Sequence, residues 1–118
     1  MPRTVLIVDD HPSFRASARA LLEAEGYDVV GEAEDVASAR REIGRLHPEV
    51  VLLDVQLPDG SGFDIAAEIA QRNGGGPAVV LVSSRDRADY GSLVEESGAA
   101  GFIAKAELCG PVLAELLP

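Results

Sequence analysis

The sequence predicts an α/β fold with a doubly wound, five-stranded parallel sheet and helices on both faces. Continuous apolar runs recur along the chain, a pattern typical of strands that are buried on both faces of a sheet. Segments with helical spacing of apolar residues separate these runs, and such alternation requires right-handed crossovers between parallel strands. The 118 residues are enough for one domain with its own core. We therefore expect a single domain over residues 1–118.

Five segments are expected to form the strands. The three most continuous apolar runs form the centre of the sheet and comprise residues 5–8, 50–53 and 78–82. Residues 27–32 are more mixed in polarity, which suits an edge strand, and residues 101–104 form a short fifth strand. The commonest arrangement of five such units is the flavodoxin-like order 2-1-3-4-5.

Three helices are predicted between the first four strands. The first begins at Pro12, which suits the first position of a helix, and stops at Gly26. Asp35 is the expected N-cap of the second helix, which Pro48 prevents from continuing. The third is expected over about residues 62–73, where a run of glycines ends it.

The last two predicted helices are weaker. The fourth, over about residues 87–97, has a thin apolar side formed by Tyr90, Leu93 and Val94. It also carries Gly91, which costs about 1 kcal/mol relative to alanine in a helix interior. We expect this helix to be the least stable. The fifth begins near Pro111 and has so few residues before the chain stops that we expect it to be truncated.

Composition and charge narrow the classes of function. The formal net charge of −10 argues against nucleic-acid binding by this chain, because neutralising phosphates needs clustered lysine and arginine. No apolar run approaches the roughly 18 residues needed to span a bilayer, and no leader-like segment follows Met1. A cytoplasmic protein without membrane contacts is therefore expected. The single Cys109 cannot form an intramolecular disulfide or a multi-cysteine metal site.

Chemically reactive side chains come at the ends of the predicted strands. Asp9 and Asp10 follow the first strand, and Asp54 follows the third. Ser83 follows the fourth strand and Lys105 the fifth. The carboxyl ends of parallel strands share one edge of the sheet, and ligands bind there at the point where the strand order reverses. Three carboxylates at that edge would repel one another without a cation, and all-oxygen ligands favour Mg²⁺.

The same five side chains suit phosphoryl transfer. Asp54 stands alone on the central strand and is the better candidate for the nucleophile, whereas the adjacent Asp9 and Asp10 suit shared metal ligation. Lys105 supplies a positive charge and Ser83 a hydroxyl donor for the transferring group. Each residue alone also fits a structural role, such as a helix cap or an exposed lysine. The occurrence of all five together favours phosphoryl transfer over five separate structural roles.

This ordered set, with Leu-Pro-Asp-Gly-Ser-Gly at residues 57–62, resembles the receiver domain of bacterial two-component response regulators. The resemblance covers essentially the whole chain. Asp-Asp-His-Pro-Ser-Phe-Arg at residues 9–15, Gly-Glu-Ala at 31–33 and Gly-Phe-Ile-Ala-Lys at 101–105 are most similar to one branch of that family. That branch carries a LuxR-type helix-turn-helix output domain.

The resemblance implies a role for each acidic residue. Asp54 would accept a phosphoryl group from the phosphohistidine of a sensor histidine kinase. Asp10 and Asp54 would bind Mg²⁺ directly, Asp9 would act through a metal-bound water, and the backbone carbonyl of Gln56 would complete the protein ligands. The protein would be a stoichiometric phosphoacceptor rather than a turnover enzyme, although it would promote its own phosphorylation and dephosphorylation.

The resemblance also implies a switch and a set of partners. The Ser83 hydroxyl would move to the phosphoryl group, Phe102 would turn inward, and the surface of helix 4, strand 5 and helix 5 would change shape. Transcription would be controlled through a DNA-binding domain after Pro118, in a longer regulator. Two homodimer surfaces are compatible with the resemblance, one through helix 4, strand 5 and helix 5 and one through helices 1 and 5.

Three other interpretations stay open. A haloacid-dehalogenase-type phosphatase also uses aspartate and Mg²⁺, but it would need a cap domain and a second acid where this chain has Gln56. A flavodoxin-like binding module would need hydroxyl- or glycine-rich phosphate contacts after the first strand, where this chain has Asp-His-Pro. A receiver domain that no longer uses phosphate would serve only as a protein-interaction module.

Overall fold

Five parallel strands form a single sheet in the order β2-β1-β3-β6-β7 in the computed structural model, which describes residues 2–72 and 75–117. The strands are β1 (Thr4–Val8), β2 (Asp28–Ala33), β3 (Val50–Asp54), β6 (Ala78–Ser83) and β7 (Gly101–Ala104). With β6 and β7 as fourth and fifth strands, the predicted order 2-1-3-4-5 is confirmed. Asp54 is the last residue of β3 and Ser83 the last of β6, so both lie at the carboxyl edge of the sheet.

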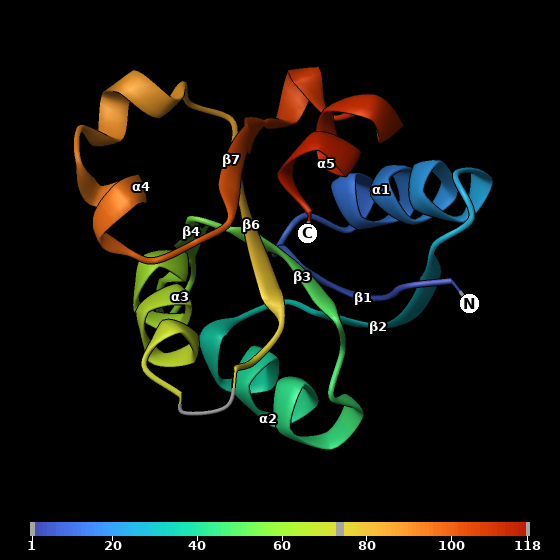
Figure 1. Cartoon of the computed structure of the whole chain (residues 1–118), viewed down its shortest axis with the longest axis horizontal. Helices are drawn as coiled ribbons and strands as arrows, with labels where there is room; N and C mark the ends of the chain where they lie inside the picture. Colours follow the sequence, from blue (N-terminus) through green and yellow to red (C-terminus); the bar gives the residue numbers. More distant parts are fainter. Residues whose placement is uncertain (1, 73–74, 118) are drawn as a thin grey trace.

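Helices cover both faces of the sheet, as predicted (Figure 1). They are α1 (Pro12–Ala24), α2 (Val36–Leu46), α3 (Gly62–Ala70), α4 (Leu93–Glu96) and α5 (Gly110–Leu116). As predicted, Pro12 begins α1, and Asp35 caps α2, with its carboxylate accepting a hydrogen bond from Ser38 N. The expected end of the third helix at Asn73 falls outside the described residues. No helix within the described residues is long and apolar enough to cross a membrane.

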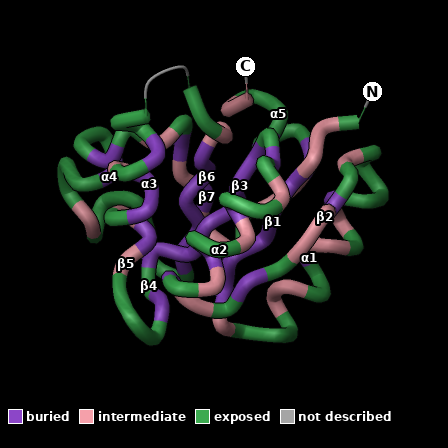
Figure 2. Tube along the Cα trace, turned by 90° about the horizontal axis from the view of Figure 1, so that it is seen from below, coloured by how far each residue is buried: buried purple, intermediate pink, exposed green. Residues whose placement is uncertain are grey.

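The sheet has a hydrophobic core on each face, because successive side chains of a strand point to opposite sides. Leu6 and Val8 pack with the buried residues of α2, α3 and α4, whereas Val5 and Ile7 pack with those of α1 and α5. Figure 2 shows the central strands β1, β3 and β6 as mostly buried segments, whereas the helices carry many exposed residues. The sheet is therefore covered on both sides, which explains its continuous apolar runs.

The prediction of a continuous fourth helix over residues 87–97 is wrong. Arg87–Tyr90 form a single 3₁₀ turn, η1, and α4 contains only Leu93–Glu96. Gly91, between them, has a φ of 58°, which interrupts any helix. Leu93 is 49% exposed, so the apolar side of this segment consists of Tyr90 and Val94.

A small antiparallel hairpin between β3 and α3 was not predicted. It comprises β4 (Gln56–Leu57) and β5 (Gly60–Ser61). At its tip, the Asp59 carboxylate accepts hydrogen bonds from the backbone N–H groups of Val36, at 2.6 Å, and Ala37, at 3.1 Å. These groups belong to the first turn of α2, whose N–H groups have no partners within the helix. Asp59 thus joins the loop after Asp54 to the start of α2.

Candidate functional site

The carboxyl edge of the sheet brings the predicted acidic residues together. Asp9, Asp10, His11 and Asp54 each offer a ligand atom, and these atoms lie within 4.8 Å of one another. A hollow of about 210 Å³ opens beside them. It is lined by Asp10, His11, Asp54, Gln56, Leu57, Pro58, Ser84 and Lys105.

Asp54 is buried, with only 4% of the residue exposed. It nevertheless lines this hollow. Its Oδ1 accepts a hydrogen bond from Gln56 N at 3.2 Å, and its Oδ2 accepts one from Lys105 Nζ at 3.3 Å. Burial, and then the charge of Asp9, raises the pKa of the Asp54 carboxyl, against the opposing effect of Lys105. A carboxylate in this position gains from any further positive charge.

Asp9 is fully buried and both its oxygens are engaged. Oδ1 accepts a hydrogen bond from His11 N at 2.8 Å and lies 3.0 Å from His11 Nδ1. Oδ2 forms an ion pair with Lys105 Nζ at 2.6 Å. His11 Nδ1 also lies 3.2 Å from Asp10 Oδ1. His11 was not among the residues predicted for this site.

Lys105 lies among the acidic residues, with its ammonium group between Asp9 and Asp54. Its position after the fifth strand predicted this edge of the sheet, but not a place between the two carboxylates. Burial alone would lower the pKa of Lys105, but the hydrogen bond with Asp9 and the charge of Asp54 outweigh burial and raise it. The ammonium also lies 4.6 Å from the ring centroid of Phe14, a cation–π contact. Lys105 is therefore a fixed cation in this site.

The acidic cluster is compatible with a Mg²⁺ ion. Two buried oxygens, Asp9 Oδ2 and Asp10 Oδ1, receive no well-oriented hydrogen bond from any residue in the described ranges. Each nevertheless lies near a basic group, since Asp9 Oδ2 is 2.6 Å from Lys105 Nζ and Asp10 Oδ1 is 3.2 Å from His11 Nδ1. A hard divalent cation with oxygen ligands would reduce the remaining repulsion among the three carboxylates. Gln56 borders the same hollow, as expected for a residue near the ion.

Ser83 lies at the same edge but is engaged elsewhere. It is 1% exposed, and its Oγ lies 2.6 Å from the Tyr90 hydroxyl and accepts a hydrogen bond from Arg85 N at 3.1 Å. Phe102 is half-buried, with its ring centroid 5.8 Å from that of Tyr90. Tyr90 was expected only on the apolar side of the fourth helix. Its pairing with Ser83 depends on the turn at Arg87–Tyr90, which helical spacing did not predict.

Comparison with known proteins decides the family. The profile of the response regulator receiver domain matches residues 5–111. This chain belongs to the receiver domain family. The match covers β1 to the start of α5, so it includes every predicted site residue.

Relatives of this receiver domain are transcriptional regulators about twice its length. It is 38% identical over 106 residues to the transcriptional regulatory protein PdtaR of Mycobacterium tuberculosis, which covers 89% of this chain and 50% of PdtaR. It is 29% identical over 111 residues to the DNA-binding transcriptional activator EvgA of Escherichia coli, covering 94% of this chain and 54% of EvgA. The chain thus spans about half the length of these curated relatives.

Solved structures give the same result. A LuxR-family two-component response regulator from Aurantimonas sp. has a TM-score of 0.84 at 30% identity, covering 98% of this chain and 86% of that one. The beryllofluoride-activated N-terminal receiver domain of Klebsiella pneumoniae RstA has a TM-score of 0.81 at 31% identity, covering 96% and 94%. The predicted resemblance to response regulators, including the LuxR branch, is confirmed.

An arginine network supports the metal side of this receiver domain from outside. Arg15, on α1, donates from Nη1 to the Asp9 carbonyl at 2.6 Å and from Nε to Glu32 at 3.0 Å. Arg19 donates to the other oxygen of Glu32 at 2.8 Å. The hydrogen bond from Arg19, and then that from Arg15, lowers the pKa of Glu32 against the effect of burial. Arg15 therefore connects the backbone of Asp9 to the neighbouring strand β2.

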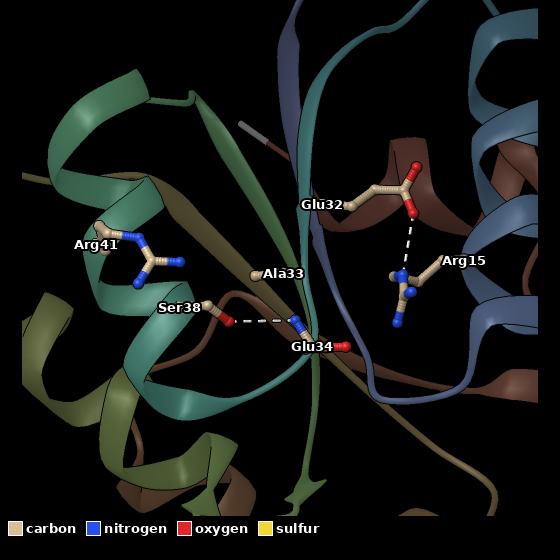
Figure 3. Close-up of a pocket in the computed structure, with 6 residues that line it drawn as sticks. All are labelled: Arg15, Glu32, Ala33, Glu34, Ser38 and Arg41. Atoms are coloured by element: carbon tan, nitrogen blue, oxygen red, sulfur yellow. Dashed lines mark hydrogen bonds and ion pairs between the residues drawn. The ribbon is translucent and has the colours of Figure 1, made fainter.

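This network borders a second pocket, of about 240 Å³ (Figure 3). Arg15 enters it from α1, Glu32 from β2, and Arg41 from α2. Arg15 is paired with Glu32, which joins α1 to β2, and Arg41 lies 3.7 Å from Glu42 within α2. This pocket shares no lining residue with the hollow beside Asp54.

Gly62 fixes the backbone directly behind the acceptor. A Cβ atom at this position would lie 2.3 Å from the Asp54 carbonyl oxygen, which is far inside van der Waals contact. Gly62 N also donates to the Val55 carbonyl at 2.8 Å. The start of α3 therefore packs against the β3 end so closely that only glycine fits.

Proposed function

We propose that this receiver domain is the phosphoacceptor of a bacterial two-component system, in which Asp54 takes a phosphoryl group from the phosphohistidine of a sensor histidine kinase. One observation carries the proposal. Of the two buried carboxylates paired with Lys105, Asp54 borders the open hollow, whereas Asp9 is fully buried behind it. A donor can therefore approach Asp54.

The residues around Asp54 suit this transfer. A carboxylate oxygen of Asp54 would form the new O–P bond while the N–P bond of the phosphohistidine breaks. Lys105 would balance the charge of the phosphoryl oxygens, and Ser83 would donate a hydrogen bond to one of them. The protein would be consumed and regenerated stoichiometrically, promoting its own phosphorylation and dephosphorylation.

The metal in this proposal is Mg²⁺. Asp10, Asp54 and the backbone carbonyl of Gln56 would hold it directly, and Asp9 would do so through water. The ion would supply positive charge for the phosphoryl oxygens and would offset the repulsion among the three carboxylates. The clustering of ligand atoms from Asp9, Asp10, His11 and Asp54 within 4.8 Å of one another supports this assignment.

The output we propose is transcriptional control. Ser83 and Phe102 would respond to phosphorylation, and the surface formed by α4, β7 and α5 would change in turn. A DNA-binding domain outside residues 1–118 would read that change, with a homodimer through α4, β7 and α5 or through α1 and α5. The names of the relatives support this, since EvgA is a DNA-binding transcriptional activator. This domain would work in the cytoplasm.

Phosphorylation of the purified domain tests the proposal. Incubation with a small phosphodonor and Mg²⁺ should add the mass of one acid-labile phosphoryl group, measured by intact mass spectrometry. The Asp54→Asn variant should gain none, because the amide is not a nucleophile. Asp64→Asn, an exposed acid in the first turn of α3, is the matched control and should behave like the wild type.

Two results would contradict the proposal. Incorporation into the Asp54→Asn variant would place the acceptor elsewhere. A wild-type domain that binds Mg²⁺ yet never gains a phosphoryl group would instead be a phosphorylation-independent interaction module.

A further inference from the structure

Tyr90 is the half-buried anchor of an otherwise exposed segment. Residues 84–89 and 91–93 are all exposed, and Tyr90 is the half-buried side chain among them. Figure 1 shows this segment in orange, between β6 and β7. The next buried residue is Val94, in the single turn of α4. The position of residues 84–93 therefore depends largely on what holds Tyr90.

Tyr90 contacts one residue from each of three elements near the acceptor site, namely α3, β6 and β7. Its ring packs edge-on against Phe63, in the first turn of α3, with centroids 5.4 Å apart. It also packs against Phe102, three residues before Lys105 on the chain, at 5.8 Å. Its hydroxyl lies 2.6 Å from Ser83 Oγ, at the end of β6. Phe63 and Phe102 offer only ring contacts, so Ser83 is the polar partner of Tyr90 among the described residues.

Ser83 cannot keep this contact and also turn to Asp54. Its hydroxyl oxygen is held by Tyr90 and by Arg85 N, both in the segment that follows β6. No hydrogen bond joins it to Asp54 or Lys105 in the described part of the chain. Either hydroxyl can be the donor in the contact with Tyr90, so this contact fixes the position of Ser83 Oγ rather than its proton. Oγ can approach an anion on Asp54 only by moving away from Tyr90 and Arg85 N.

We propose that Tyr90 is a positioning residue whose hydroxyl holds Ser83 away from Asp54 in the anion-free protein and is released when Ser83 binds an anion there. The inference rests on the proposed function, because it requires an anion at Asp54. Release removes the polar anchor of residues 84–93, which lets that segment shift. The hydroxyl that links site and segment thus belongs to Tyr90, since Phe102 has none.

Beryllofluoride with Mg²⁺ is the probe, as an anion that occupies the position of a phosphoryl group on aspartate. Tyr90→Phe should bind it roughly two- to tenfold more tightly than the wild type, because one neutral hydrogen bond no longer has to be exchanged. Tyr27→Phe is the matched control, since Tyr27 packs in the opposite core, and it should leave the affinity unchanged. In a Ser83→Ala background, Tyr90→Phe should have no effect on affinity.

A spectroscopic readout tests the contact itself. The chain has two tyrosines and no tryptophan, so the Tyr27→Phe variant reports the environment of Tyr90 alone. Its phenol absorbance and emission should shift when beryllofluoride is added. Adding Ser83→Ala should produce a shift in the same direction without the anion, because the same hydrogen bond is lost.

The outcomes separate this inference from the proposed function. If wild type and Tyr90→Phe bind beryllofluoride equally, or Tyr90→Phe has the same effect without Ser83, the positioning role is wrong while the acceptor site stands. If the wild type binds no beryllofluoride with Mg²⁺, the proposed function fails and the inference fails with it.

Discussion

The acidic end of β1 and β3 and the segment from residue 84 to residue 98 are built in opposite ways. At the acidic end each functional group is held from several directions. Asp9 contacts His11 and Lys105, its carbonyl accepts from Arg15, and its N–H donates to the Ala33 carbonyl. Asp54 is held from the side of β4 and packed from behind by Gly62. This region is preorganised.

The segment after β6 has few such contacts. It consists of one 3₁₀ turn and one turn of α-helix, with left-handed glycines at Gly91 and Gly98. Val94 and Ser97 are buried, and Ser97 Oγ donates to the Val94 carbonyl at 2.6 Å. Chemistry gains from groups held in advance, whereas a response needs a segment that moves at low cost. The contrast teaches that this domain separates the two requirements along the chain.

The largest difference in stability between the two regions should come from replacing one glycine in each by alanine. Gly62→Ala should lower the free energy of unfolding by about 3 kcal/mol, because its Cβ would overlap the Asp54 carbonyl in a region that cannot yield. Gly91→Ala also meets an unfavourable φ, but it has open space and a loose segment, so about 1 kcal/mol is expected. Urea denaturation of both variants measures this, and equal losses would contradict the contrast.

Lys105→Met should lower the free energy of unfolding by about 2 kcal/mol at pH 7. It removes the cation between Asp9 and Asp54, and the estimate is at the low end for a broken buried pair because the lysine side chain keeps 15% exposure. The pKa of Lys105 is raised, so its contribution is present at neutral pH and is lost only as pH rises through that raised pKa. Thermal melts with and without Mg²⁺ check this. The variant should regain more stability from Mg²⁺ than the wild type does, and a smaller gain would argue against shared acidic ligands.

Arg15→Met should lower the free energy of unfolding by about 1.5 kcal/mol, because it removes a charged hydrogen bond to the buried backbone carbonyl of Asp9. Arg19→Met is the matched control, since Arg19 also binds Glu32 but has no contact with Asp9. Its more exposed ion pairs should contribute at most about 0.5 kcal/mol. Urea denaturation distinguishes the two. Equal effects would mean that Arg15 acts only through Glu32.

Asp54→Asn should have the smallest effect, and this effect has the opposite sign. The free energy of unfolding should rise by about 1 kcal/mol at pH 7. The raised pKa means that the folded protein binds this proton more tightly than the unfolded chain, whose carboxyl titrates near 3.8. The ionised side chain therefore lowers stability, and this cost grows as pH rises above 3.8 towards the raised pKa. The gain in Tm should disappear at pH 3. The same gain at both pH values would show that it does not come from the charge.

The contrast between regions also explains where prediction from sequence succeeded. The strands, their order and the helices α1 and α2 follow from apolar periodicity and from local caps such as Pro12 and Asp35. The fourth helix was wrong because its few apolar residues do not specify a helix against the positive φ of Gly91. The hairpin at residues 56–61 was missed because it is two residues wide and depends on Asp59 reaching across to α2.

Apolar runs and strand-end chemistry were sufficient to place Asp9, Asp10, Asp54, Ser83 and Lys105 on one edge of the sheet, because parallel strands end together whatever their neighbours are. The partners of these groups needed the tertiary structure. Lys105 between Asp9 and Asp54, His11 on two carboxylates and Tyr90 on Ser83 are contacts between side chains whose directions depend on packing. Local sequence carries periodicity and caps, whereas hydrogen bonds across the fold depend on angles and distances that only the folded chain sets.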